Sequence, residues 1–271
     1  MIKALKSISW RNVLYGMLWL ISLLGLGILL SFISVKSKQY ACNDLQIIIP
    51  GEQSFIARED VDRLLKEKHG ELIGKTLSSI PIHTIEHELK AIPFVEEALV
   101  NVDMNGKLII RVKQREAVVR VINERGDDFY VDKQGLKMPL SPYYAPLVLV
   151  ANGRISERFN NPLDSMETTV LKDLYKTAEF IQADTLWNNQ IEQLYVNTQG
   201  DIEMVPRIGK QKIVLGNADF LTQKFEKLLL FYKQIIPAVG WQVYQKVDLS
   251  FTNQLVCEKN ENYTPNSNKI Q

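Results

Sequence analysis

The sequence has no excess of charge of either sign. Its 32 Lys and Arg residues nearly balance 31 Asp and Glu residues, so the formal net charge is +1. Proteins that bind nucleic acid usually present a basic surface, and this composition gives no argument for such a partner. Cysteine is also scarce, with only Cys42 and Cys257. A single disulfide between them stays open, but we expect two unpaired thiols because Cys42 lies close to a long apolar segment.

Motifs that position catalytic groups are nearly absent. The chain contains no G-x-S-x-G turn, no P-loop and no G-x-G-x-x-G. The exception is an H-x-x-E-H pattern, which on a helix would place His83 and His87 on one face as zinc ligands, with Glu86 as the base. The apolar residues of the same segment fall on the opposite side, so these three polar residues are expected to face solvent. A zinc hydrolase is thus an alternative, and our main expectation is no catalytic site, no metal and no cofactor.

One hydrophobic run, residues 13–35 (VLYGMLWLISLLGLGILLSFISV), carries no charged side chain. As a helix it is about 34 Å long, enough for a hydrocarbon core of about 30 Å. A cleavable signal peptide has a shorter apolar region and a small-residue cleavage site, and neither is present. We therefore predict an uncleaved transmembrane helix. A small excess of basic residues before it predicts a cytoplasmic tail at residues 1–12.

The spacing of apolar residues changes within the segment 44–115. An apolar run at 45–49 predicts a strand, and apolar residues at helical spacing predict helices from Arg58 and again over 82–92. From Val95 the period becomes two, which predicts two further strands. The expected order is strand, helix, helix, strand, strand.

Residues 116–258 are predicted to form a second, mostly antiparallel β-domain with two helices, so the fold class of the whole is α+β. Helical stripes lie over 167–182 and 220–236. The last predicted strand covers 247–256, where apolar residues alternate on one face. The polar segment 259–271 is expected to be a disordered tail.

A series of motifs runs through both regions in a fixed order. In the first they are Gly74 and Leu77, Ile85-Glu86-x-x-Leu89, Pro93-Phe94-Val95-x-x-Ala98-x-Val100 and Gly106-Lys107-Leu108-x-Ile110-x-Val112-x-Gln114-Arg115. In the second they are Tyr130-Val131-Asp132-x-x-Gly135, Ile213-Val214-Leu215-Gly216 and Val247-Asp248-Leu249-x-Phe251. The first set resembles a POTRA domain, and the two sets together resemble the FtsQ/DivIB family of bacterial cell-division proteins. The stretch 133–141 is similar to the Bacteroidetes-type branch.

The resemblance implies a non-enzymatic scaffold of the division machinery, the divisome, which links early and late division proteins. It places the span in the cell inner membrane, the N-terminus in the cytoplasm and the bulk of the chain in the periplasm. Expected partners are small bitopic proteins similar to FtsB and FtsL, together with other divisome components, and no small-molecule substrate. Another alternative is a POTRA-bearing transport component, but such proteins usually carry several units ahead of a β-barrel.

The resemblance also implies where a partner docks. In the family the last strand accepts a partner strand at its exposed edge, which offers unpaired backbone groups. Phe251 stands where the family has a partner-contacting tyrosine, and Asn217 where some relatives carry an arginine for a partner acid. An ordinary internal strand is the competing interpretation. The expected partner-binding residues are Val247, Leu249, Ser250, Phe251, Thr252, Asn253, Gln254, Leu255 and Asn217.

Overall fold

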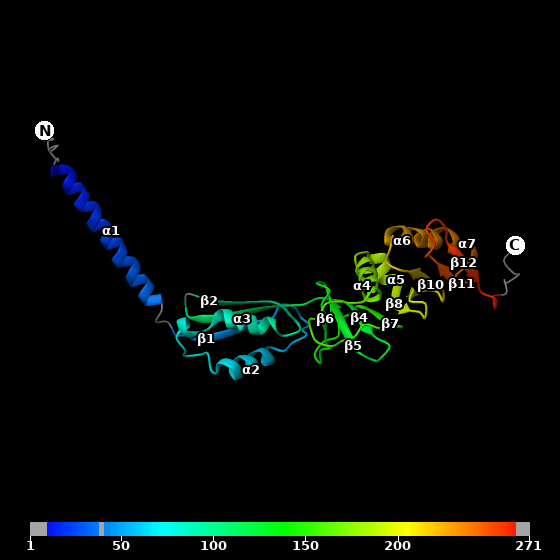
Figure 1. Ribbon diagram of the computed structural model, residues 1–271, viewed down its shortest axis with the longest axis horizontal. Helices are drawn as coiled ribbons and strands as arrows, with labels where there is room; N and C mark the ends of the chain where they lie inside the picture. The colour runs from blue at the N-terminus through cyan, green and yellow to red at the C-terminus, as the bar shows by residue number, and fades with distance from the viewer. Residues whose placement is uncertain (1–9, 38–40, 104, 264–271) are drawn as a thin grey trace, which may run out of the picture. The chain divides into compact units, whose positions relative to one another are not determined.

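The computed structural model describes residues 10–37, 41–103 and 105–263 (Figure 1). Residues 1–9 of the predicted cytoplasmic tail and residues 264–271 of the predicted C-terminal tail lie outside the described residues. The chain divides into two compact units. The first comprises residues up to 50, 57–91 and 97–113, and the second comprises 51–56, 92–96 and the chain from 114 onward.

Helix α1 (Trp10–Ser37) contains the whole predicted apolar run. No proline interrupts these residues, and the large apolar side chains from Leu14 to Leu29 are exposed. Within the described parts of the chain, no helix is both long enough and apolar enough to cross a membrane. The predicted segment is therefore confirmed as a helix, whereas the predicted membrane span is not found.

The first unit has the predicted order of elements, with one short 3₁₀ turn added between the helices. Its sheet has the order β1-β3-β2, and β1 runs parallel to β3. The helical stripes of the sequence become the buried faces, with Val61 and Leu65 on one helix and Ile85 and Leu89 on the other. The elements are β1 (Asp44–Ile48), α2 (Arg58–His69), η1 (Leu77–Ser79), α3 (Ile82–Lys90), β2 (Val95–Val102) and β3 (Lys107–Gln114).

An ion-pair cluster joins α2 to α3. His69 Nε2 lies 2.7 Å from Glu88 Oε2, and Lys68 Nζ lies 3.4 Å from Glu88 Oε1. The hydrogen bond with His69, helped by Lys68, holds the pKa of the Glu88 carboxyl below its ordinary value of 4.5. A carboxyl group whose pKa is lowered by folding stabilises the folded state when the pH is above its unfolded-state pKa. This contribution is lost as the pH falls through the folded-state pKa.

Glu88→Gln is therefore expected to lower the melting temperature at neutral pH. The variant should also lose less stability than the native chain as the pH falls from about 5 to about 3. Thermal unfolding followed by circular dichroism at both ends of this range measures the difference. The exposed carboxyl Glu97 provides the control, since Glu97→Gln removes a charge from the same unit without touching the cluster. Equal pH profiles for the native chain and Glu88→Gln would contradict the prediction.

The second unit contains one nine-stranded sheet with the order β12-β11-β10-β9-β8-β7-β4-β5-β6. The β4/β7, β7/β8 and β10/β11 pairs are parallel and the other five pairs are antiparallel, so the sheet is mixed, with the antiparallel pairs in the majority as predicted. The strands are β4 (Ala117–Ile122), β5 (Asp128–Asp132), β6 (Lys137–Met138), β7 (Leu149–Gly153), β8 (Ile191–Val196), β9 (Ile202–Pro206), β10 (Lys212–Gly216), β11 (Tyr244–Asp248) and β12 (Val256–Lys259).

The helices of this unit pack with the sheet in a single core. Apolar residues of α4, such as Leu174 and Ile181, and of α6, such as Phe225 and Leu228, bury against residues of the sheet. The second predicted helix is interrupted by a π turn just before Pro237, which has no N–H to donate to the preceding turn. A short extra helix also follows α4. The helices are α4 (Thr169–Gln182), α5 (Thr185–Gln190), α6 (Leu221–Leu230), η2 (Phe231–Ile235) and α7 (Ile236–Val239).

A buried ion pair fixes the segment between β6 and α4. Lys137 Nζ lies 2.5 Å from Glu157 Oε1, and both side chains are 1% exposed. The Glu157 carboxylate also accepts hydrogen bonds from the Thr168 hydroxyl and backbone N–H. Burial alone would raise the pKa of Glu157, but the bonds from Lys137 and Thr168 outweigh it and lower the pKa. The pair therefore holds both charges inside the protein.

Candidate protein-interaction site

The predicted last strand at 247–256 is two strands with a loop between them. Asp248 ends β11 because its carboxylate accepts hydrogen bonds from the Ser250 N–H and hydroxyl, which turns the chain out of the sheet. Within β11, Val247 pairs with Ile213 on one side and with Cys257 on the other. The prediction of an open edge at 247–256 is therefore wrong.

The open edge belongs to β12 instead. In the described part of the chain β12 pairs with β11 alone. At the opposite end of the sheet, β6 is covered, since Lys137 N–H donates to Asp164 O and Leu163 N–H donates to Lys137 O. β12 also contains Lys259, and Tyr263 N–H donates to Asn260 O at 3.1 Å, so the predicted disordered tail does not begin at 259.

The predicted partner-binding residues fall into three groups. Val247 and Leu249 are buried in the core, and Leu255 packs partly against it. Asn253 and Gln254 lie exposed on the loop between β11 and β12. The structure brings the remaining four to one cavity, namely Asn217, Ser250, Phe251 and Thr252.

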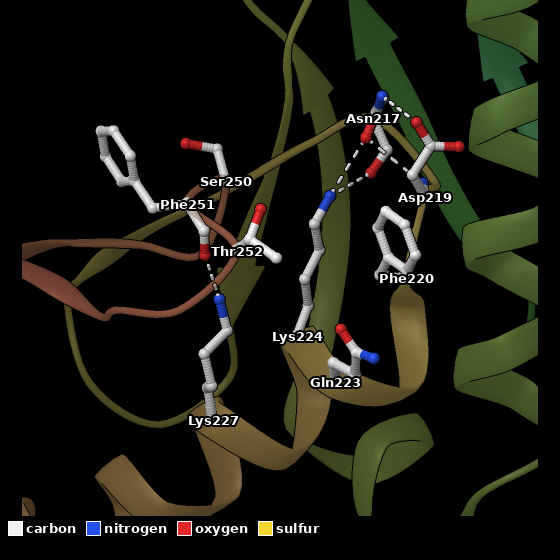
Figure 2. A pocket seen from close by; sticks show the side chains of 9 residues that line it. All are labelled: Asn217, Asp219, Phe220, Gln223, Lys224, Lys227, Ser250, Phe251 and Thr252. Atoms are coloured by element: carbon white, nitrogen blue, oxygen red, sulfur yellow. Dashed lines mark hydrogen bonds between the residues drawn. The ribbon is translucent and has the colours of Figure 1, made fainter.

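This cavity has a volume of about 220 Å³ and lies between the β10–α6 turn, helix α6 and the β11–β12 loop. Figure 2 shows Lys224 and Lys227 leaving neighbouring turns of α6 toward the two loops. Residues three apart on a helix share a face, which places both ammonium groups at the cavity. The lining residues are Asn217, Asp219, Phe220, Gln223, Lys224, Lys227, Ser250, Phe251 and Thr252.

Lys227 fastens the β11–β12 loop to α6. Its Nζ donates to the carbonyl oxygens of Leu249 at 3.1 Å, Gln254 at 3.4 Å and Phe251 (Figure 2). A single ammonium thus satisfies carbonyl groups along a segment that has left the sheet. Burial lowers the pKa of Lys227.

Lys224 holds the other side of the cavity. It is 5% exposed, and its Nζ donates to the backbone oxygen of Asn217 at 2.9 Å and to the Asn217 Oδ1 at 3.1 Å. The Asn217 amide in turn donates to Asp219 Oδ2 at 2.6 Å. Burial lowers the pKa of Lys224. The lining has two ammonium groups and one carboxylate, which favours an acidic ligand group.

Two exposed phenyl rings belong to the same lining. Phe220 is 66% exposed and Phe251 is 46% exposed. Phe220 also has a left-handed backbone with a φ of 55°, a conformation that costs a bulky residue energy and concentrates at functional sites. Aromatic residues are enriched at protein interfaces.

The H-x-x-E-H pattern does not form a metal centre. His83 and His87 are exposed, while Glu86 Oε1 accepts the Val100 N–H at 2.9 Å. That hydrogen bond lowers the pKa of Glu86. No group of three metal-ligating side chains occurs among the residues that the structure describes. Contrary to the expectation that Glu86 faces solvent, its carboxylate accepts a hydrogen bond from an amide of β2. Both cysteines are free thiols, as predicted.

Comparison with known families gives two matches. Residues 116–258 match the family described as FtsQ/DivIB, C-terminal related, and residues 40–113 match the POTRA-like domain. No curated protein matches the chain. The two matched regions together contain every strand of both sheets except the last residue of β3 and of β12.

Proposed function

Because the chain belongs to the FtsQ/DivIB family, we propose that it is a scaffold of the bacterial division machinery, without enzymatic activity, that links early and late division proteins. The match of residues 116–258 to the family's C-terminal region carries this proposal. We also propose domain limits at 44–115 for the POTRA domain and 116–258 for the β-domain. The C-terminal match favours the scaffold over the transport and hydrolase alternatives.

We propose that α1 anchors the chain in the inner membrane, with the N-terminus in the cytoplasm and the remainder in the periplasm. The support is the uncharged run at 13–35 and the exposure of its large apolar side chains. Membrane fractions washed with alkaline carbonate test the anchor, since an inserted helix stays in the pellet. Release into the wash would contradict it.

Partners similar to FtsB and FtsL would add a strand to the outer edge of β12 and place side chains in the cavity of Figure 2. Main-chain pairing needs only the open edge, which tolerates the departures at Asn217 and Phe251 from the family pattern. With no arginine at 217, the cation for a partner carboxylate is Lys224, whose Nζ donates to the two oxygens of Asn217 and keeps one donor, whereas Lys227 already donates to three loop carbonyls. β12 therefore replaces residues 247–256 as the docking strand.

Depletion of the native protein, with and without a tagged copy, tests the proposed function in cells. We expect depleted cells to grow as filaments, and the tagged copy to collect at mid-cell and restore septation. The tagged copy without residues 244–263 should fail to restore septation while remaining at the membrane. Normal septation after full depletion would overturn the proposal.

A further inference from the structure

A second cavity of the same unit shares no residue with the cavity of Figure 2. It has a volume of about 610 Å³ and lies between the β9–β10 turn, the end of α7 and the outer part of the β11–β12 hairpin. Its lining contains no carboxylate, and its one cation is Lys210. The lining residues are Gly209, Lys210, Trp241, Gln242, Tyr244, Gln245 and Asn260.

The indole of Trp241 is held rigidly at this cavity. Its ring centroid lies 5.5 Å from that of Tyr232. Gly209 approaches it so closely that a Cβ at this position would lie 3.0 Å from Trp241 Cε3, and a φ of 97° suits glycine there. The amide of Gln211, itself 2% exposed, donates to the Trp241 carbonyl at 2.5 Å. Trp241 nevertheless stays 37% exposed, so one part of a fixed aromatic surface faces the cavity.

Uncommitted hydrogen-bonding groups surround this ring. The side-chain amides of Gln242 and Gln245 are exposed and have no hydrogen-bond partner among the described residues. Each amide supplies both a donor and an acceptor. Asn260 is fixed beside them, because its Nδ2 donates to the Gln242 carbonyl at 3.2 Å. The cavity thus combines an apolar surface with paired donors and acceptors.

We propose that this cavity binds a neutral oligosaccharide. A pyranose ring presents C–H groups on its face, which stack on an indole, and hydroxyl groups on its rim, which both donate and accept hydrogen bonds as carboxamides do. A proline-rich peptide fits less well, because such peptides dock between several exposed aromatic rings and Tyr244 packs against Phe231 with centroids 5.8 Å apart. Without a carboxylate the cavity does not suit a metal ion, and one lysine does not suit a polyanion. This inference does not depend on the proposed function.

Titration of the purified full chain in detergent with chitotetraose and with cellotetraose, followed by calorimetry, tests it. We expect saturable binding of at least one tetrasaccharide. Trp241→Ala should weaken it about tenfold or more, as the loss of an aromatic contact would, whereas Trp241→Phe should keep most of it. Gln242→Ala with Gln245→Ala should also weaken it, and Phe251→Ala, in the other cavity, should leave it unchanged.

Two results would overturn the inference. One is the absence of binding by both tetrasaccharides to a chain that melts like the native protein. The other is Trp241-dependent binding of a decaproline peptide in place of the sugars. Neither result bears on docking at β12, which uses other residues.

Discussion

Lys137→Met is expected to lower the free energy of unfolding of the second unit by about 3–5 kcal/mol, the usual cost of removing one partner from a buried ion pair. The reason is that the Glu157 carboxylate, which is 1% exposed, would lose the ammonium that compensates its burial and would face an apolar side chain instead. Loss of the bond from Lys137 Nζ to the Arg158 carbonyl at 3.0 Å adds to the effect. Urea unfolding followed by tryptophan fluorescence measures it, since Trp187 is buried in this unit.

A second lysine of the same unit provides the matched control. Lys133 Nζ lies 2.5 Å from Glu116 Oε2, but these side chains are 57% and 60% exposed. An exposed pair contributes about 0–1 kcal/mol, so Lys133→Met should change stability little. Equal losses of unfolding free energy for Lys137→Met and Lys133→Met would show that burial of the Lys137–Glu157 pair does not increase its contribution to stability.

Lys227→Met is expected to weaken partner binding about tenfold or more, because each hydrogen bond to a charged group contributes about 1.5–3 kcal/mol. The variant removes the donor that holds the carbonyl groups of Leu249, Phe251 and Gln254. Amides of the loop at 249–255 should then exchange with solvent faster even without a partner. This second readout separates loss of loop order from loss of a direct contact.

Lys233→Met is the matched control for this prediction, since Lys233 is an exposed lysine in η2, the segment that directly follows α6. It should leave both the loop and the affinity unchanged. A Lys227→Met chain that binds the partner as tightly as the native chain would show that the loop conformation does not matter for docking.

Local sequence patterns were sufficient for most elements but not for their pairing. The stripes containing Ile85 and Leu89 predicted the helix faces correctly, because burial on a helix repeats with the helical period. The parallel pairing of β4 with β7 could not be predicted, since alternation within a strand does not specify its neighbour. The last strand was predicted too long because Val247, Leu249 and Phe251 alternate across the turn that Asp248 makes.

The same limit applies to the candidate site. The resemblance led to Asn217 and to residues 250–252, which do line the cavity. It missed Phe220, Lys224 and Lys227. The role of Lys227 depends on hydrogen bonds to a loop more than 20 positions further along the sequence, which no local pattern reveals. The only signal in the sequence was the spacing of two lysines on one helix face, which by itself is typical of a solvated surface.

Backbone hydrogen exchange of the chain with and without the periplasmic domain of an FtsB-like partner tests strand addition most directly. Strand addition should protect alternate amides of Val256–Lys259 when the partner binds, because an added strand hydrogen-bonds every second residue of an edge. Amides of β6, at the far end of the sheet, should not change. Unchanged exchange along β12 in a chain saturated with partner would contradict docking at this edge.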